Sequence, residues 1–119
     1  MAKLQITLQS DKNIPGGSQI AVYAPRGFIF TCAYFRTQVL ATTTTCYTKQ
    51  NLARFTVDSQ DAKPPNLMLG ITVYATNPQF TPQPNFWGCD IISPLGAFVD
   101  TISEYGTQGL SHANILRSM

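Results

Sequence analysis

The stretch IPGGSQIAVYAPRGFIFTC, which runs from Ile14 to Cys32, contains a turn, a strand, a second turn and the start of another strand. Between its two turns, Ile20, Val22 and Ala24 fall on one face of an extended chain, and this period of two is typical of a half-buried strand. A Pro-Gly-Gly cluster precedes that strand and a Pro-Arg-Gly cluster follows it. Because proline holds φ near one value and glycine tolerates positive φ, these clusters predict turns on both sides. The stretch therefore predicts a corner of a β-sandwich.

The same alternation of apolar and polar residues recurs along the rest of the chain. It predicts seven strands, at residues 3–9, 18–24, 28–35, 38–47, 52–58, 67–76 and 86–92. The run from Leu67 to Thr76 is the strongest of these and is expected to lie at the centre of a sheet. Alternation is lost at Ala33, Tyr34 and Phe35, which indicates a bulge or burial on both faces. Seven strands without a helical period predict a two-sheet antiparallel β-sandwich of immunoglobulin-like type, with a jelly roll as the alternative.

A chain of 119 residues has room for one domain with a single core. We expect residues 1–92 to form the sandwich, with Trp87 in its core rather than on its surface. Residues 93–119 are expected to form a C-terminal strand, a linker or an assembly tail. Apolar residues in this tail either pack back onto the same domain or contact a neighbouring copy. The candidate contact residues are Phe98, Ile102, Ile115 and Leu116.

The composition indicates a polar surface with few charges. Charged residues make up 12% of the chain, and the formal net charge is +2. The Lys and Arg residues are scattered singly, so the basic patch of a nucleic-acid-binding protein is not present. No stretch is apolar enough for a membrane span, and residues 1–10 do not resemble a signal peptide. We expect an extracellular or cell-surface domain excised from a longer protein, with no nucleic-acid partner and no direct membrane insertion.

Three cysteines, Cys32, Cys46 and Cys89, allow one disulfide and leave one thiol. Cys32 continues the apolar face of Phe28 and Phe30, and Cys46 can face the same interior, so Cys32 and Cys46 are the expected pair. Such a bond closes a loop of about fifteen residues and would stabilise the fold by roughly 3 kcal/mol. The alternative is three buried, unbonded thiols, because free cysteine is among the most buried residue types.

Residues for catalysis or metal binding do not form a recognisable motif. The single histidine, His112, lies in the tail among Gly, Ser and Asn, which gives no basis for a Ser-His-Asp or Cys-His arrangement. The carboxylates show no EF-hand spacing, and no CxxC motif indicates zinc. A shared calcium site of Asp11, Asp58 and Asp61 is the alternative, if their turns converge. The sequence predicts no enzyme, no cofactor and no metal site.

Two groups of turn and core residues form longer patterns. The first follows I-P-x-G-x-x-I and then P-x-G-F-x-F-x-C, and its residues are Ile14, Pro15, Gly17, Ile20, Pro25, Gly27, Phe28, Phe30 and Cys32. The second follows N-P-x-x-T-P-x-x-N-x-W, and its residues are Asn77, Pro78, Thr81, Pro82, Asn85 and Trp87. Together they resemble a β-sandwich repeat of large surface proteins in alveolate protists, dinoflagellates especially, over about residues 4–92. The resemblance implies an extracellular, repeated, structural or adhesive module whose partners are like domains or other surface proteins.

Three functions fit these observations. The first is a non-enzymatic structural or adhesive module, one unit of a surface or filamentous assembly. The second is a self-assembling capsid or fibre subunit, which the polar, sparsely charged surface and the tail favour. The third is a carbohydrate-binding module whose aromatic rings stack on sugars. The first candidates for stacking are Tyr23 and Tyr74, and the further candidates are Tyr34, Tyr47, Phe80 and Phe86.

Overall fold

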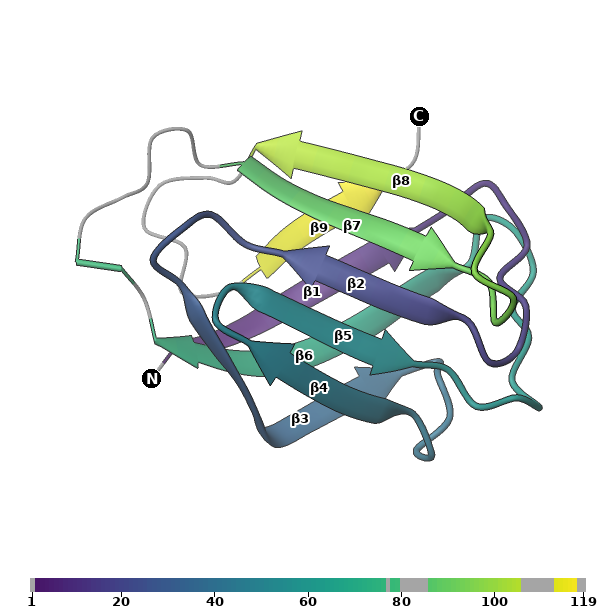
Figure 1. Ribbon diagram of the computed structural model, residues 1–119, viewed down its shortest axis with the longest axis horizontal. Coiled ribbons are helices and arrows are strands. Elements are labelled where there is room, and N and C mark those ends of the chain that lie inside the picture. The colour runs from purple at the N-terminus through teal and green to yellow at the C-terminus, as the bar shows by residue number, and fades with distance from the viewer. Residues whose placement is uncertain (1, 77, 80–85, 106–112, 118–119) are drawn as a thin grey trace.

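The computed structural model describes residues 2–76, 78–79, 86–105 and 113–117. This part of the chain is all-β and contains no helix (Figure 1). Its strands are β1 (Ala2–Gln9), β2 (Gln19–Tyr23), β3 (Ile29–Gln38), β4 (Thr45–Lys49), β5 (Leu52–Thr56), β6 (Met68–Thr76), β7 (Phe86–Ile92), β8 (Phe98–Tyr105) and β9 (Ala113–Arg117).

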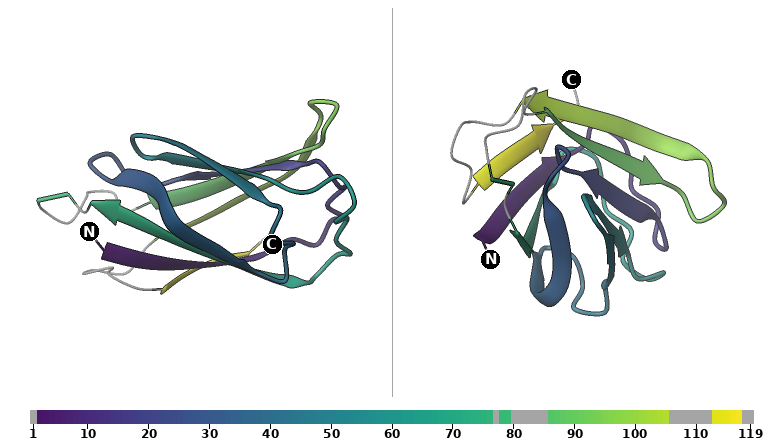
Figure 2. Two further views of the ribbon diagram at one scale, coloured as in Figure 1. Left: turned by 90° about the horizontal axis from the view of Figure 1, so that it is seen from below. Right: turned by 60° about the vertical axis from the view of Figure 1, so that its left-hand side comes forward.

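The strands form two sheets that pack face to face as a β-sandwich (Figure 2). One sheet has the strand order β3-β6-β1-β9, and the other has the order β4-β5-β2-β7-β8. Neighbouring strands are antiparallel except β1 and β9, which are parallel. The predicted two-sheet sandwich is confirmed, and β6 lies between β3 and β1 as expected for a central strand. The immunoglobulin-like and jelly-roll subtypes stay predictions.

Alternating burial explains why these segments form strands around one core. In β1, Leu4, Ile6 and Leu8 are almost fully buried, whereas Lys3 and Gln5 face solvent. The pattern repeats along β6, as the period of two requires. The five-stranded sheet contributes buried apolar side chains from the opposite side, and these include Ile20, Val22, Phe55, Cys89, Ile91 and Ile102.

Trp87 lies in the core, as predicted from the sequence. Its side chain is 1% exposed, and its ring lies 5.0 Å from that of Phe28 between centroids. Phe28 and Phe30 are also buried, so the segment that leaves the turn after β2 contributes to the core directly.

The turns predicted around β2 are present, and they pack against distant segments. Ser18 is buried, and its hydroxyl donates a hydrogen bond to the carbonyl of Pro15 at 2.6 Å. A Cβ atom on Gly16 would overlap the backbone carbonyl of Ser59, so the close approach of these two loops requires glycine. Gly27 adopts a φ of 106°, in the region that favours glycine.

The expectation of one extended segment at 38–47 is wrong. A loop at 39–44 separates β3 from β4, although its threonines favour extended structure. In this loop Leu40 is 5% exposed and enters the core, and the amide of Ala41 donates to the carboxylate of Asp61 at 2.7 Å. Tertiary contacts therefore override the local propensity of the threonine run.

The chain after Ile92 contributes two further strands to the sandwich. β8 pairs with β7 in the five-stranded sheet, and Ile102 is 1% exposed in the core. Of the two alternatives for the tail, Ile102 therefore packs onto its own domain and is not available to a neighbouring copy, because its place in β8 directs it inward. β9 pairs with β1 of the same chain, with Ile115 opposite Thr7 and Leu116 opposite Leu8.

Candidate functional site

A hollow of about 640 Å³ lies on the solvent-facing side of the four-stranded sheet. Three neighbouring strands line it. β1 supplies Lys3 and Gln5, and β6 supplies Thr72 and Tyr74. β3 forms one wall of the hollow with Tyr34, Arg36, Thr37 and Gln38.

Strand pairing places these outward side chains in cross-strand rows. Tyr74 lies opposite Lys3 on one side and Thr31 on the other. The next outward row joins Arg36, Thr72 and Gln5. Since directly opposed residues have Cβ atoms about 4.5–5.5 Å apart, each row can contact a single ligand.

A bulge in β3 raises the wall of the hollow above the sheet. The register jumps from Thr31 opposite Tyr74 to Arg36 opposite Thr72, so the four residues from Cys32 to Phe35 lie opposite Val73 alone. The sequence predicted either a bulge or two-sided burial here, and the structure has the bulge. Such insertions re-aim side chains at the edge of a sheet.

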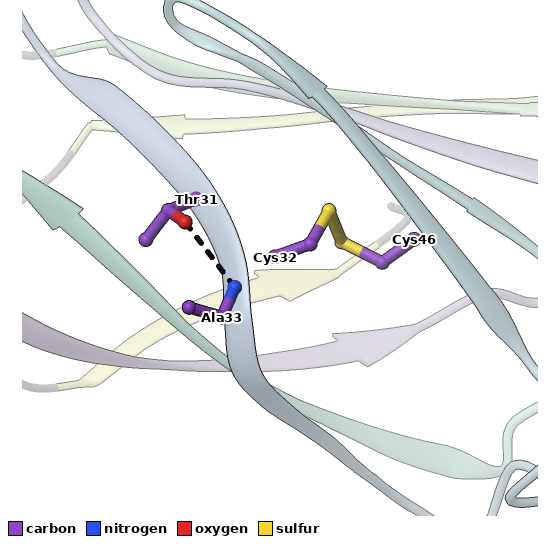
Figure 3. The surroundings of a disulfide bond; sticks show 4 residues. All are labelled: Thr31, Cys32, Ala33 and Cys46. Carbon is purple, nitrogen blue, oxygen red and sulfur yellow. Dashed lines mark hydrogen bonds between the residues drawn. A yellow bond between two sulfur atoms is a disulfide. The ribbon is translucent and has the colours of Figure 1, made fainter.

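Two side chains hold this bulge from the inner side. Cys32 forms a disulfide with Cys46 of β4, which confirms the predicted pair (Figure 3). Phe35 packs against the core residue Phe55, with ring centroids 6.1 Å apart. Because Cys32 and Phe35 are anchored inward, Tyr34 between them projects outward and is 81% exposed.

The projecting ring of Tyr34 meets Tyr74 on the sheet. The two ring centroids are 6.4 Å apart and the ring planes cross at 74°, which is an edge-to-face arrangement. Tyr34 reaches this position with a φ of 61°, a conformation that costs energy for residues other than glycine. Val39, just beyond the wall, has a φ of 76°. Gln50 and Asn66 also have positive φ, of 54° and 66°, and do not line the hollow.

A smaller hollow of about 120 Å³ continues the first along β6. The two share Gln5, Gln38 and Thr72, and Gly70 lies in the floor of the smaller one. A Cβ atom on Gly70 would lie 3.0 Å from Oε1 of Gln38, so the absence of a side chain lets Gln38 pack close over this strand. From Tyr74 to Gly70 the strand rises by roughly 13 Å, which makes the site an elongated groove.

The groove carries positive charge. Lys3 and Arg36 are its charged lining residues, and no Asp or Glu lines either hollow within the described part of the chain. Among the described residues the ion pairs are those of Lys12 with Asp11 and of Lys63 with Asp61, so neither groove cation is neutralised by an ion pair there.

Of the predicted stacking residues, the structure brings Tyr74 and Tyr34 together and leaves Tyr23 apart. Tyr23 is 42% exposed on β2, in the other sheet. Tyr47 is also in that sheet, where the guanidinium of Arg54 lies 5.4 Å from its ring centroid. Phe86 is 39% exposed on β7 of the same sheet, and Phe80 lies outside the described residues. Sequence reasoning missed the polar lining of the groove, because outward Lys, Gln, Thr and Arg residues on separate strands carry no signal of proximity.

The carboxylates proposed for a calcium site are each engaged by other groups. Asp61 forms an ion pair with Lys63 at 2.6 Å, and Asp58 accepts a hydrogen bond from the amide of Gln60 at 2.8 Å. Asp11 pairs with the neighbouring Lys12. In residues 2–76, 78–79, 86–105 and 113–117, no three His, Cys, Asp or Glu side chains lie close enough to hold a metal ion.

Comparison of this chain with protein-family models, with curated proteins and with solved structures found no match. The described residues also contain no helix long and apolar enough to cross a membrane. The likeness to protist surface repeats therefore stays a prediction, as does the expected extracellular location. Fold and groove together define a disulfide-bonded β-sandwich with a polar, aromatic and basic groove on one outer face.

Proposed function

We propose that this protein is a non-enzymatic adhesive module of the cell surface or extracellular space that binds carbohydrate in the groove on the four-stranded sheet. The observation that carries the proposal is the contact of Tyr34 with Tyr74, held by the disulfide-anchored bulge beside a row of amides and hydroxyls.

The chemistry of the groove suits a sugar. Aromatic rings pack against the C–H faces of pyranoses, and the two tyrosines offer ring faces at 74° to each other. The side-chain amides of Gln5 and Gln38 both donate and accept hydrogen bonds, as the hydroxyl of Thr72 does, which matches the mixed character of sugar hydroxyls. An oligosaccharide could lie along β6, from the tyrosines toward Gly70.

The disulfide and the composition support the proposed location at the cell surface or in the extracellular space. Structural disulfides persist in oxidising compartments, which include the extracellular space. Few charges and many polar uncharged side chains suit a surface module. Such a module would adhere to glycans or to like domains.

A glycan array probed with the full chain, followed by calorimetric titration of the hits, tests the proposal. We expect saturable binding that is lost in Tyr74→Ala and strongly weakened in Tyr34→Ala. Tyr23→Ala and Tyr47→Ala remove comparable exposed rings from the other sheet and serve as matched controls that keep full affinity. Circular dichroism and thermal unfolding verify that each variant is folded.

Two results would overturn carbohydrate binding in this groove. One is the absence of saturable binding to any glycan on the array. The other is a loss of affinity in Tyr23→Ala or Tyr47→Ala as large as that in Tyr74→Ala, which would place the binding site elsewhere.

Self-assembly is a second candidate, favoured by two exposed apolar side chains at one end of the five-stranded sheet. Leu95 is 96% exposed and Phe98 is 71% exposed, and β8 is an edge strand of its sheet. Edge strands with apolar side chains promote association between chains. Light scattering coupled to size exclusion on the full chain should then show oligomers that disappear in a Leu95→Ser/Phe98→Ser variant. A monomer at all concentrations in both proteins would dismiss this candidate.

A further inference from the structure

We infer that the groove selects acidic glycans, saccharides that carry a carboxylate or a sulfate, and that Lys3 and Arg36 bind the acidic group. This inference rests on the carbohydrate-binding function proposed above and names its ligand class. It is carried by the placement of two cations that no described residue neutralises, beside the tyrosine pair.

The positions of the cations relative to the rings favour an acidic sugar. Lys3 is the direct cross-strand neighbour of Tyr74. Arg36 lies opposite Thr72, one outward position along β6 from Tyr74, and diagonal neighbours of this kind are roughly 7–8 Å apart. A sugar ring stacked on Tyr74 would therefore present a ring substituent to both cations.

The acidic residues of the described chain lie away from the groove. Asp90 is on β7 and Asp100 and Glu104 are on β8, both in the other sheet, and Asp11, Asp58 and Asp61 are in loops. An anion that enters the groove meets two cations and no described carboxylate. The groove thus attracts anions although the whole chain has a formal net charge of only +2.

Three of the cations elsewhere on the described surface are engaged by the protein itself. Lys12 and Lys63 form ion pairs, and Arg54 stacks on Tyr47. By contrast, no ion pair within the described residues occupies the guanidinium of Arg36. A guanidinium binds a carboxylate or sulfate through two parallel hydrogen bonds, which adds directional selectivity to the point charge of Lys3.

Matched saccharides separate this inference from the function on which it rests. We would titrate the full chain with lactose, sialyllactose and sulfated lactose, which share a core and differ in having no acidic group, a carboxylate or a sulfate. We expect at least one acidic form to bind ten-fold or more tightly than lactose at low salt. The difference should shrink as salt is raised, because exposed charges are screened. The two acidic arms show whether the site takes the carboxylate or the sulfate.

Charge variants then assign the effect to named residues. Lys3→Gln and Arg36→Gln should each lower affinity for the acidic sugar several-fold more than they lower affinity for lactose. Arg36→Lys keeps the charge but loses the paired hydrogen bonds, so we expect an intermediate loss. Lys49→Gln removes an exposed cation from β4 of the other sheet and is the matched control, which should bind as the unmodified chain does.

Each outcome bears on one of the two proposals. Equal affinity for neutral and acidic sugars, with binding still lost in Tyr74→Ala, overturns the acidic selectivity and leaves the carbohydrate-binding function standing. A loss in Lys49→Gln equal to that in Lys3→Gln also overturns it, since the attraction would then be unspecific. Binding of no saccharide in any arm overturns both.

Discussion

Cys32 and Cys46 join the two sheets of the sandwich along one edge, with their Cα atoms 5.8 Å apart. Cys32 lies on β3, the edge strand of the four-stranded sheet, and Cys46 lies on β4, the edge strand of the five-stranded sheet (Figure 1). In immunoglobulin domains the conserved disulfide lies inside the sandwich and packs on tryptophan. Here the bond joins the edge strands of the two sheets. Tyr34, two residues after Cys32 in β3, lines the groove.

Removal of this disulfide should destabilise the protein and weaken ligand binding together. A Cys32→Ala/Cys46→Ala variant should lose roughly 3 kcal/mol of unfolding free energy, because the unfolded chain regains the freedom that the closed loop had removed. Urea unfolding followed by tryptophan fluorescence measures this loss. Dithiothreitol should lower the midpoint of the unmodified protein to that of the variant and leave the variant unchanged. Equal midpoints with and without the reductant would contradict the prediction.

Substitution of Val39 by glycine should stabilise the fold. Val39 is β-branched, is 51% exposed and has a φ of 76°, so its side chain contributes strain and little burial. Relief of that strain, less the added flexibility of the unfolded chain, should raise the unfolding free energy by about 1 kcal/mol in Val39→Gly. Asn66, at a φ of 66°, is the matched control, because asparagine tolerates this conformation and Asn66→Gly should change little. A lower midpoint for Val39→Gly than for the unmodified protein would refute the assignment of strain.

The thiol of Cys89 should be unreactive until the protein unfolds. Its side chain is 1% exposed, and burial raises the pKa of the thiol above its ordinary value, with the charges of Asp90 and Asp100 adding to the shift. Because the thiolate is the reactive form, a thiol reagent at pH 8 should modify Cys89 only at the rate of global opening. Labelling measured by mass spectrometry across a urea series checks this. Rapid stoichiometric labelling without denaturant would show that the β7 core is locally open.

Asp61 should stabilise the protein at neutral pH and lose this effect in acid. Burial raises the pKa of Asp61, but hydrogen bonds from Lys63 and from the amide of Ala41 outweigh it, and the pKa lies below its ordinary value. The stabilisation is therefore fully present above the unfolded-state pKa and is lost as the pH falls through the folded-state pKa. Asp61→Asn should cost about 1 kcal/mol at pH 7, discounted for partial exposure of the pair, and much less near pH 2.5.

A double-mutant cycle isolates the charge pair in that prediction. Lys63→Gln should reproduce part of the loss at pH 7, and Asp61→Asn/Lys63→Gln should lose less than the sum of the two single variants. Strict additivity, or an undiminished effect of Asp61→Asn in acid, would argue against the ion pair as the source.

The positions and faces of most strands could be read from the sequence. The alternation of Leu4, Ile6 and Leu8, and that of Trp87, Cys89 and Ile91, is a local property, because successive side chains of any strand point to opposite faces. The pairing of the two bonded cysteines followed from similar reasoning about faces. The loop at 39–44 was missed because its conformation depends on the burial of Leu40 and on a contact with Asp61, twenty residues away from Ala41.

The groove could not be predicted in this way, because it depends on the spatial order of strands that are distant in the sequence. By itself the sequence determined that Lys3 and Tyr74 lie opposite the apolar faces of their own strands, and it assigned no face to Arg36. Only the tertiary structure decided that these three residues are neighbours, by pairing β6 with both β1 and β3. It also decided that the bulge turns Tyr34 onto Tyr74, since the disulfide and the contact with Phe55 fix that backbone from the other side. Strand order and bulge direction depend on how two faces pack over the whole domain, and no local pattern of residues encodes that packing.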